Sequence, residues 1–388
     1  MAASRVPAVY LDHHATTPLD ERVLEAMAPF LSEEFGNAAS HTHAYGWRAE
    51  AAVDDARERL AEMLGAASPS EIVFTSGATE SNNLAILGLA DAQRERKHLV
   101  TICTEHPSVL DSARALGRRG FEVEVLPVDD MGRITADQVA SALREDTFLV
   151  SAMAANNEIG VLHPLSEVAQ VCRDRGVAFH SDAAQAAGKI DLHAERDGID
   201  LLSVSGHKIY GPKGVGLLRV RKSGSPRLRL EPRQYGGGHE GGLRSGTLPV
   251  SLIVGLARAL ELCLEEREAE AVRLAGLRDQ LHARLAEALP GETTLNGDPE
   301  ARLPGNLNLS FASVDGDRLL ADLGGLAVSS GSACSSANPE PSPVLLALGL
   351  SKAAAKASLR FGFGRGNRVE DVDFAFERIV SAVASQRS

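Results

Sequence analysis

Residues 71–92 of the chain read EIVFTSGATESNNLAILGLADA, a β-rich run that passes through a turn of small residues into a helical pattern. The first N–H groups of such a helix have no acceptor within it, and the helix dipole adds partial positive charge, so the turn is suited to binding phosphate. Thr79 and Ser81 would supply hydroxyl groups. The segment lacks the spacing and the lysine of a Walker motif, and an ordinary capped helix that binds nothing remains the alternative.

Six more β-rich runs follow before residue 220, and several are apolar without alternation, as strands buried on both faces should be. Helical patterns lie between many of them, such as residues 165–174, whose apolar side chains share one face. The alternation predicts an α/β protein with a largely parallel sheet of seven strands. The six further strands are expected at HLVTIC (98–103), FEVEVLPV (121–128), TFLVSAM (147–153), VAFHSD (177–182), DLLSVS (200–205) and GVGLLRV (214–220).

The pattern changes after residue 250. Residues 251–289 read as one long helix, apolar at first and then highly charged, which predicts a helix that leaves a large domain and enters a smaller one. Strands are expected at 306–311 and 357–364, and a final amphipathic helix at 369–383. A chain of 388 residues also exceeds what one core usually supports. The segment SSANPEPSP (335–343), with three prolines, is the candidate flexible loop.

Composition narrows the class of protein. The net charge is −12 with no basic cluster, which disfavours direct binding to nucleic acid, because phosphate contacts need a basic surface. The N-terminus has no apolar signal-peptide core, and no run of about 18 apolar residues predicts a membrane span. We therefore expect a cytoplasmic protein with reduced thiols and no membrane contact.

The cysteines and histidines do not predict a metal site or a disulfide framework. Cys103, Cys172, Cys263 and Cys334 are far apart, and the first three lie in apolar or helical contexts that favour buried, inert thiols. The pairs His13-His14 and His41-x-His43 have no cysteine or carboxylate at ligand spacing, so no metal is predicted.

Two further residues could carry chemistry. Asp182 ends a predicted strand, where a carboxylate points into the crevice in which α/β proteins bind ligands, although a helix N-cap is an equal alternative. Lys208, in SVSGHKIYGPKGVG (203–216), follows a strand and precedes a glycine-rich turn that would expose its ammonium to a cleft. A partly desolvated lysine can form a Schiff base, whereas most lysines are solvated. Lys213, in the glycine turn, and Lys189, expected to be exposed, are the competing lysines.

Together, the helix start, Asp182 and Lys208 are the three parts needed to hold pyridoxal 5′-phosphate. The helix start would take the phosphate, Asp182 would keep the pyridinium nitrogen protonated, and Lys208 would form the Schiff base. Their order along the chain suits one sheet.

Long, mutually ordered motifs then show that the sequence resembles the pyridoxal-phosphate-dependent cysteine desulfurases of the IscS/NifS type, in the class V aminotransferase family. The resemblance runs nearly from end to end, although Ala184 and Ala155 stand where the family often has Thr and His. The motifs are YLDHHATTP (10–18), FGNAASHTHAYGW (35–47), EIVFTSGATESNNLAI (71–86), TEHPSVLD (104–111), NNEIG (156–160), HSDAAQ (180–185), SGHKIYGPKG (205–214), GGGHEGGLRSGTLPV (236–250) and SSGSACSS (329–336).

This resemblance implies a fold of the pyridoxal-phosphate fold-type I class and a homodimer. The large cofactor-binding domain would span residues 16–257, and a smaller α+β domain would combine 1–15 with 258–388 and carry a catalytic cysteine loop. The implied reaction converts L-cysteine to L-alanine and leaves the sulfur as a persulfide on Cys334. An acceptor protein, such as an iron–sulfur scaffold or a tRNA thiolation enzyme, would then receive the sulfur.

The resemblance also assigns roles residue by residue. Lys208, His106 and Cys334 would be catalytic, with His106 stacked on the cofactor ring. Arg360 would pair with the substrate carboxylate, which suits its planar fork of donors. The expected cofactor contacts are Asp182 to the ring nitrogen, Gln185 to the phenolic oxygen, Asn157 beside cofactor and substrate, Ala78, Thr79, Ser205 and His207 to the phosphate, and Thr247 to the phosphate from the other subunit.

Other functions remain open at this point. An aminotransferase or another lyase of the same fold would need no cysteine nucleophile, and a selenocysteine lyase differs only in its substrate. A cofactor-binding regulatory protein without catalysis is disfavoured, because Lys208, His106 and Cys334 are all present. Arg233 and Arg244 are expected to be turn or interface residues rather than catalytic ones.

Overall fold

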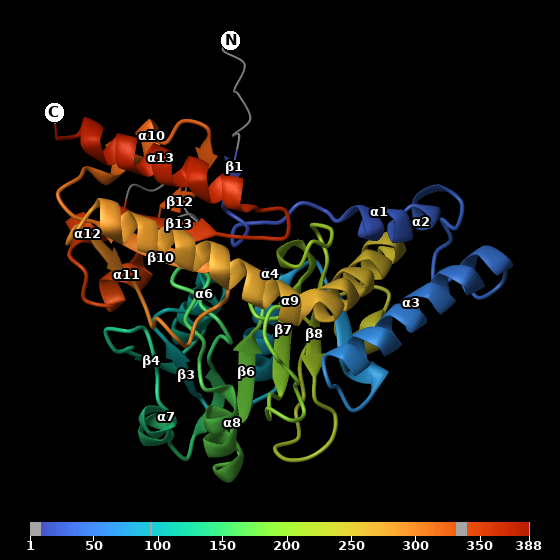
Figure 1. Cartoon of the computed structure of the whole chain (residues 1–388). Helices are drawn as coiled ribbons and strands as arrows, with labels where there is room; N and C mark the ends of the chain where they lie inside the picture. Colours follow the sequence, from blue (N-terminus) through green and yellow to red (C-terminus); the bar gives the residue numbers. More distant parts are fainter. Residues whose placement is uncertain (1–8, 94, 331–339, 388) are drawn as a thin grey trace.

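A seven-stranded sheet forms the centre of the larger part of the computed structural model, which describes residues 9–93, 95–330 and 340–387 (Figure 1). β8 runs antiparallel to both of its neighbours, and the other adjacent pairs are parallel. The prediction of a largely parallel seven-stranded sheet is confirmed. In spatial order the strands are β2 (Ile72–Thr75), β8 (Gly216–Val220), β7 (Leu201–Ser205), β6 (Ala178–Asp182), β5 (Thr147–Ser151), β3 (His98–Ile102) and β4 (Glu122–Leu126).

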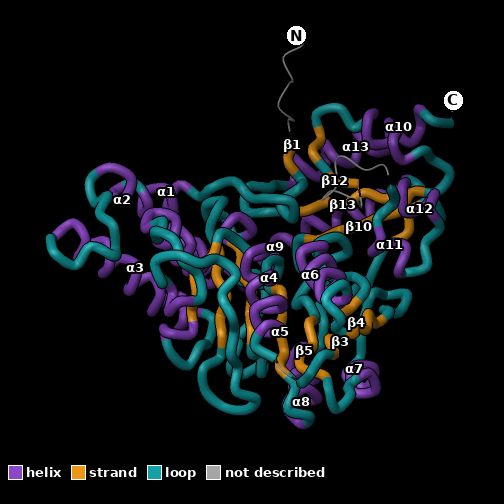
Figure 2. The backbone as a smooth tube through the Cα atoms, turned by 180° about the vertical axis from the view of Figure 1, so that it is seen from behind, coloured by secondary structure: helices purple, strands orange, loops and turns teal. Residues whose placement is uncertain are grey.

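Helices cover both faces of this sheet, which explains its continuous apolar strands. Successive residues such as Leu99 and Val100 belong to two different buried clusters, because side chains alternate across a strand. One cluster includes α3 (Ala44–Met63), α7 (Ala136–Ala142) and α8 (Leu165–Asp174), and the other includes the helix that begins with α4 (Ala78–Asn83) and ends with α5 (Leu89–Asp91), together with α6 (Pro107–Gly117). Figures 1 and 2 show these two layers from opposite sides.

A second, smaller sheet has its own core. It is antiparallel, in the order β12 (Ser329–Ser330), β13 (Ser358–Gly362), β10 (Asn306–Phe311) and β9 (Thr293–Leu295). The strand β1 (Val9–Tyr10) pairs with β11 (Leu326–Ala327), so the first described residues of the chain also belong to this part. The helices near it are α10 (Gly316–Asp322), α11 (Pro343–Ala347), α12 (Lys352–Lys356) and α13 (Val369–Ser385).

The 39-residue helix α9 (Val250–Ala288) joins the two parts. Leu256 and Leu260 in its first half are buried in the core of the large sheet, whereas Leu281 and Leu285 are buried in the core of the small one. A helix that passes from one core to the other was predicted from residues 251–289. The domain boundaries at residues 16 and 258 stay a proposal, which the two separate cores support.

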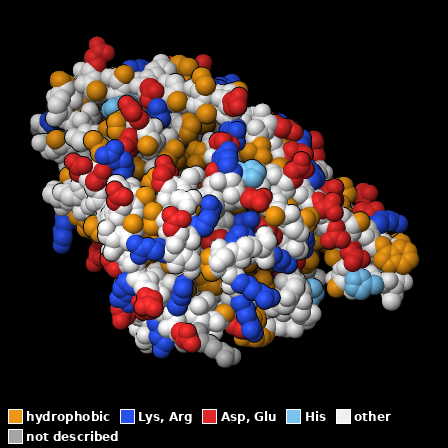
Figure 3. Space-filling view, turned by 90° about the horizontal axis from the view of Figure 1, so that it is seen from below, with side chains coloured by type: hydrophobic (Ala, Val, Ile, Leu, Met, Phe, Trp, Pro, Cys, Tyr) orange, Lys and Arg blue, Asp and Glu red, His pale blue; other side chains and the backbone are white. Residues whose placement is uncertain are grey.

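Two short helices, α1 (Glu21–Met27) and α2 (Pro29–Ser32), lead into α3 at one end of the molecule. Figure 3 shows acidic and basic side chains intermixed over the visible face, with hydrophobic side chains at the projecting end. No helix among the described ranges is both long and apolar enough to cross a membrane. Residues 335–339 of the expected loop lie outside the described residues, and its last residue, Pro343, already begins α11.

Candidate active site

A cavity of about 660 Å³ opens where the carboxyl ends of the parallel strands face the small sheet. Almost all of the site residues predicted from the sequence line this one cavity, although they come from six separate stretches of the chain. The predicted residues that line it are Ala78, Thr79, His106, Asn157, Asp182, Gln185, Ser205, His207, Lys208 and Arg360.

The start of α4 forms the wall suited to an anion. Gly77 precedes the helix with φ 148°, and no side chain caps the first N–H groups, so those of Ala78 and Thr79 are available toward the cavity. A Cβ on Gly77 would lie 3.5 Å from Ser205 Oγ. The expected role of Ser81 is wrong: its hydroxyl is buried and bonds with Thr75 Oγ1 at 2.8 Å instead.

Asp182 ends β6, and both of its carboxylate oxygens are held. Oδ1 accepts from the backbone N–H of Ala184 at 2.9 Å, and Oδ2 accepts from Asn82 Nδ2 at 2.7 Å. The N-cap alternative for Asp182 is wrong, because a turn and not a helix follows β6; the carboxylate holds that turn and also lines the cavity. Each oxygen keeps a lone pair with which it could accept a further hydrogen bond from a protonated ring nitrogen.

His106 is the N-cap of α6, and its orientation is fixed by neighbours that the sequence did not reveal. The backbone N–H of Ser108 donates to His106 Nδ1 at 3.1 Å, so the neutral imidazole carries its proton on Nε2. Burial lowers the pKa of His106 and favours that neutral form. Ser108 Oγ lies 2.8 Å from both His106 Nδ1 and Asn82 Nδ2, so Asn82 connects His106 with Asp182.

The N-terminal segment holds Lys208 in the cavity. Lys208 follows β7 in a single turn of 3-10 helix and donates from Nζ to the carbonyls of His14 and Ala15, at 2.7 Å each. Its neighbour His207 lies 3.1 Å from Thr16 Oγ1 through Nδ1. Burial, together with the charge of Lys208, lowers the pKa of His207 to about 4, so this ring is neutral at pH 7.

The two competing lysines have different surroundings. Lys213 is exposed in its glycine turn at the edge of the cavity. The prediction that Lys189 is exposed is wrong, because its side chain is partly buried and Nζ donates to Gln185 Oε1 at 3.0 Å. The covering helix α9 comes from a distant part of the sequence, which hid this burial from a local pattern.

Arg360, in β13 of the small sheet, reaches the same cavity and is only 2 % exposed. Its Nη1 donates to the Asn157 carbonyl at 2.9 Å, and its Nη2 donates to Asp12 Oδ1 at 2.8 Å. Nε is buried and has no hydrogen-bond partner among the described residues. A buried guanidinium with an unused donor suits a carboxylate ligand.

Two predicted site residues are absent from the described lining of this cavity, for different reasons. Thr247 is exposed and does not line it, and Cys334 lies outside the described residues. The expectation for the other cysteines holds for Cys172 and Cys263, which are buried, but Cys103 is partly exposed. Burial raises the pKa of the Cys263 thiol to about 11, so it is protonated at pH 7.

The two arginines expected in turns form ion pairs. Arg244 lies 2.9 Å from Glu80, and Arg233 lies 2.5 Å from Asp91. Neither arginine lines the cavity, which is compatible with their predicted structural role.

The donor set fits pyridoxal 5′-phosphate. The open start of α4 with Ser205 suits its phosphate, the Asp182 carboxylate suits its pyridinium nitrogen, and the Lys208 amine suits its aldehyde carbon. Arg360, held by Asp12 and the Asn157 carbonyl in the wall of the cavity, adds a cationic group suited to a substrate carboxylate.

Comparison with known proteins agrees with this assignment. The family model described as "Aminotransferase class-V" matches residues 9–374. The chain is 55% identical over 333 residues to "Cysteine desulfurase IscS" of Anaeromyxobacter dehalogenans, which covers 86% of this chain and 81% of that protein.

Solved structures agree as well. A "NIFS-LIKE PROTEIN" superposes with a TM-score of 0.90 at 36% identity, over 97% of this chain and all of that one. "SspA in complex with cysteine" superposes with a TM-score of 0.80 at 37% identity, over 92% of this chain and 98% of that one.

Proposed function

Because the chain belongs to the aminotransferase class-V family and, within it, to the pyridoxal-phosphate-dependent cysteine desulfurases, we propose that it takes the sulfur of L-cysteine onto Cys334 and releases L-alanine. One observation carries this proposal: Lys208, Asp182, His106 and Arg360 line a single cavity. The complex of the relative SspA with cysteine supports L-cysteine as the substrate.

We assign the residues that hold the cofactor as follows. The start of α4, with Ala78 and Thr79, binds the phosphate together with Ser205 and His207, while Asp182 and Gln185 hold the ring nitrogen and ring oxygen. The neutral His207 can donate or accept without adding charge beside Lys208. When bound, pyridoxal phosphate supplies an electron sink for the Cα of an amino acid.

The side chains around it orient the substrate and move protons. Arg360 binds the substrate carboxylate through its guanidinium, while Asp12 and the Asn157 carbonyl keep that group in place. Lys208 Nζ, as a neutral amine, takes the Cα proton, and the carbonyls of His14 and Ala15 direct that nitrogen. His106 presents the proton on Nε2, because Ser108 occupies Nδ1.

Cys334 is assigned as the sulfur acceptor from the sequence alone, since it lies outside the described residues. Its thiolate attacks the sulfur of the substrate, so an S–S bond forms and the C–S bond of cysteine breaks. The electron pair of that bond stays with Cβ, which gains a proton and becomes the methyl group of alanine. The balance is one cysteine and one thiol giving one alanine and one persulfide, with no outside oxidant. A soft thiolate suits this attack better than a hydroxyl.

The test is to compare Cys334→Ala and Cys334→Ser with the wild-type protein. Both variants should keep the visible absorbance of bound cofactor, but they should lose alanine formation from L-cysteine and the trapped persulfide. An aminotransferase or a cysteine-independent lyase would retain turnover in Cys334→Ala, and that result would reject the persulfide route. A wild-type protein that stays colourless after pyridoxal phosphate is added would reject the enzyme itself.

Association with other chains is part of the proposal. The exposed Thr247 supports a homodimer in which this residue reaches the phosphate of the partner subunit. The end of the molecule near α2 and α3 exposes large apolar side chains, and such a patch is typical of protein contacts (Figure 3). These side chains are Leu31, Phe35, Tyr45 and Trp47.

We also propose a protein acceptor for the sulfur, either an iron–sulfur scaffold or a tRNA thiolation enzyme, and a cytoplasmic location. Sedimentation velocity tests the dimer. Capture on the persulfide-loaded protein under non-reducing conditions, with Cys334→Ser as the control bait, tests the acceptor.

A further inference from the structure

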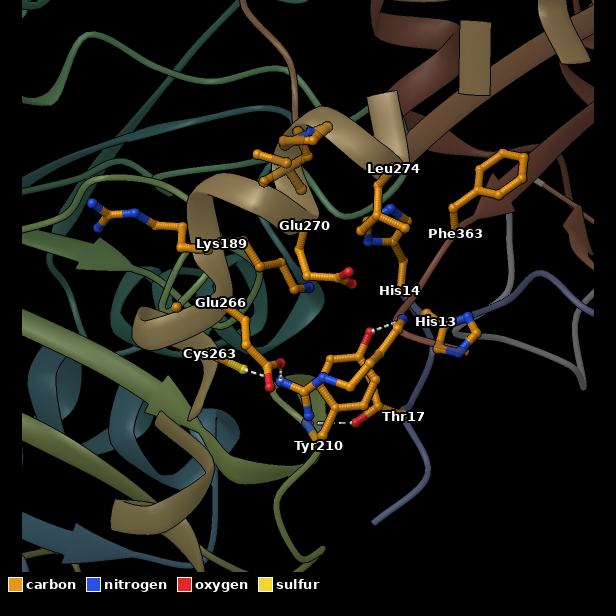
Figure 4. Close-up of a pocket in the computed structure, with 17 residues that line it drawn as sticks. His13, His14, Thr17, Lys189, Tyr210, Cys263, Glu266, Glu270, Leu274 and Phe363 are labelled. Atoms are coloured by element: carbon orange, nitrogen blue, oxygen red, sulfur yellow. Dashed lines mark hydrogen bonds and ion pairs between the residues drawn. The ribbon is translucent and has the colours of Figure 1, made fainter. Parts of the chain in front are cut away.

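A second, smaller cavity of about 60 Å³ lies directly behind the candidate active site, next to α9 (Figure 4). It shares only His14 with the first cavity. Lys189 extends into it, and α9 contributes Cys263, Glu266 and Glu270 to its wall. The assigned chemistry uses no group from this cavity other than the backbone of His14.

Lys189 contacts the active site through Gln185. Its Nζ donates to Gln185 Oε1 at 3.0 Å, and His14 Nδ1 lies 3.1 Å from the same oxygen. Gln185 Nε2 donates one proton to the His14 carbonyl at 2.8 Å. The His14 carbonyl can only accept and the Lys189 ammonium can only donate, so the two groups together hold the Gln185 amide in one orientation, with its oxygen toward Lys189 and its NH₂ group toward the carbonyl.

The alternative partners of Lys189 are already engaged. Glu266 forms an ion pair with Arg365 at 2.8 Å and another with Arg22 at 2.7 Å. Glu270 lies 2.7 Å from Arg273. Burial, together with the positive charge of Lys208, lowers the pKa of Lys189 to about 7. Lys189 is therefore only partly charged at pH 7 and becomes fully charged at lower pH, where its positive form lies beside a site that already contains Lys208.

We propose that Lys189 is a positioning residue of the cofactor site: it fixes the Gln185 amide with Nε2 toward the ring oxygen of the cofactor, and it places a cation behind that contact. This inference rests on the proposed function, because it assigns Gln185 to the cofactor. It gives Lys189 two separable effects, one on the orientation of an amide and one on the charge beside the cofactor.

Four variants separate these effects. Lys189→Met removes both the donor and the charge, Lys189→Gln keeps a donor without charge, and Lys189→Arg keeps both. Lys97→Met is the matched control. Lys97 is exposed and precedes the amino end of β3, whereas the cavity lies at the carboxyl ends of the strands. The two readouts are the dissociation constant of pyridoxal phosphate for the apoprotein and the pH midpoint of the visible-absorbance change of the bound cofactor.

Lys189→Met should weaken cofactor binding about fivefold, the effect of one neutral hydrogen bond, and Lys189→Gln should not. Both variants should raise the pH midpoint by about one unit, since a nearby cation disfavours the protonated form of the cofactor. Lys189→Arg and Lys97→Met should stay close to wild type in both measurements. In a Gln185→Ala background, Lys189→Met should cause no further loss of binding, which a merely structural lysine would not show.

An unchanged midpoint in both uncharged variants would overturn the charge effect, and binding losses that add to those of Gln185→Ala would overturn the positioning effect. If Lys189→Met fails to fold, Lys189→Gln still tests the midpoint. A wild-type protein that binds no pyridoxal phosphate would instead reject the proposed function, so the two failures are distinguishable.

Discussion

Arg360 Nη2 lies 2.8 Å from Asp12 Oδ1, so an ion pair joins two residues that are 348 positions apart. Arg360 belongs to the small sheet, whereas Asp12 follows the N-terminal strand and precedes the segment that holds Lys208. The guanidinium is therefore held in place before any substrate arrives. Preorganisation of this kind reduces the entropy lost when a ligand binds.

Arg360→Lys should lower kcat/KM for L-cysteine by about a hundredfold, because an ammonium cannot reproduce the planar, charge-assisted contact with a carboxylate. Steady-state alanine formation measures this loss. The absorbance of the bound cofactor should remain. The control is Arg318→Lys, at an arginine exposed on α10. An unchanged KM would remove Arg360 from the substrate site.

Asn82→Ala should lower both the stability of the protein and its affinity for the cofactor. Asn82 Nδ2 donates to Asp182 Oδ2 and to Ser108 Oγ, so its loss leaves a buried carboxylate oxygen without that donor. We expect the free energy of unfolding to fall by about 1–3 kcal/mol, and cofactor affinity by about tenfold. Urea titration and cofactor dialysis measure the two effects. The adjacent Asn83→Ala, which loses only a bond to a backbone carbonyl, should change cofactor affinity much less.

Glu158→Gln should stabilise the protein at high pH. Burial raises the pKa of Glu158 to about 7, and Ser342 Oγ donates to its Oε2 at 2.5 Å. The folded state therefore holds a proton that the unfolded state releases above its ordinary pKa of about 4.3, so Glu158 costs stability progressively between about pH 4 and pH 7. Above pH 7 the cost reaches at most about 4 kcal/mol. Thermal unfolding from pH 4 to 8 should show the melting temperatures of wild type and Glu158→Gln diverging as the pH rises. Parallel curves would contradict this assignment.

Glu240→Ala should release the loop that carries Thr247. The Glu240 side chain is 1% exposed, lies 2.7 Å from Arg57, and accepts from the Phe74 N–H at 2.7 Å. Removal of one partner of a buried pair costs about 3–5 kcal/mol, and in the proposed homodimer the loop should then hold the second subunit less well. Sedimentation velocity should show more monomer. Combining Glu240→Ala with Arg57→Ala should cost less than the sum of the two single changes, since no unpaired guanidinium remains.

Much of the fold was predictable because it depends on local patterns. Residues 200–205, predicted as a strand, contain β7, which is buried along its whole length. The partial burial of Lys189 was not predictable, because the helix that covers it, α9, comes from a distant part of the sequence. The direction of each side chain around the helix also matters. Ser81 and Asn82 lie in the first turns of α4, but both side chains are buried and bond with other residues inside the protein.

The sequence predicted which residues would line the cavity better than it predicted the contacts that hold them. Asp182 ends a strand and Lys208 follows one, and both line the cavity at the carboxyl ends of the strands, while their roles stay a prediction. The carbonyls of His14 and Ala15, which direct Lys208, carry no signal in the sequence, because any residue has a backbone carbonyl. The link through Ser108 and Asn82 was hidden for a similar reason, since these polar residues are ordinary near helix starts.

Helix α9 should resist rotation of the small sheet relative to the large one. A continuous helix of 39 residues is a rod of about 58 Å, and its two ends are embedded in different cores. A loop hinge would let the small sheet swing freely, whereas a rod anchored at both ends resists such rotation. A change in the width of the active-site cavity must therefore be absorbed as slight bending or sliding along α9, so that Arg360 and Lys208 stay in register as the cavity adjusts.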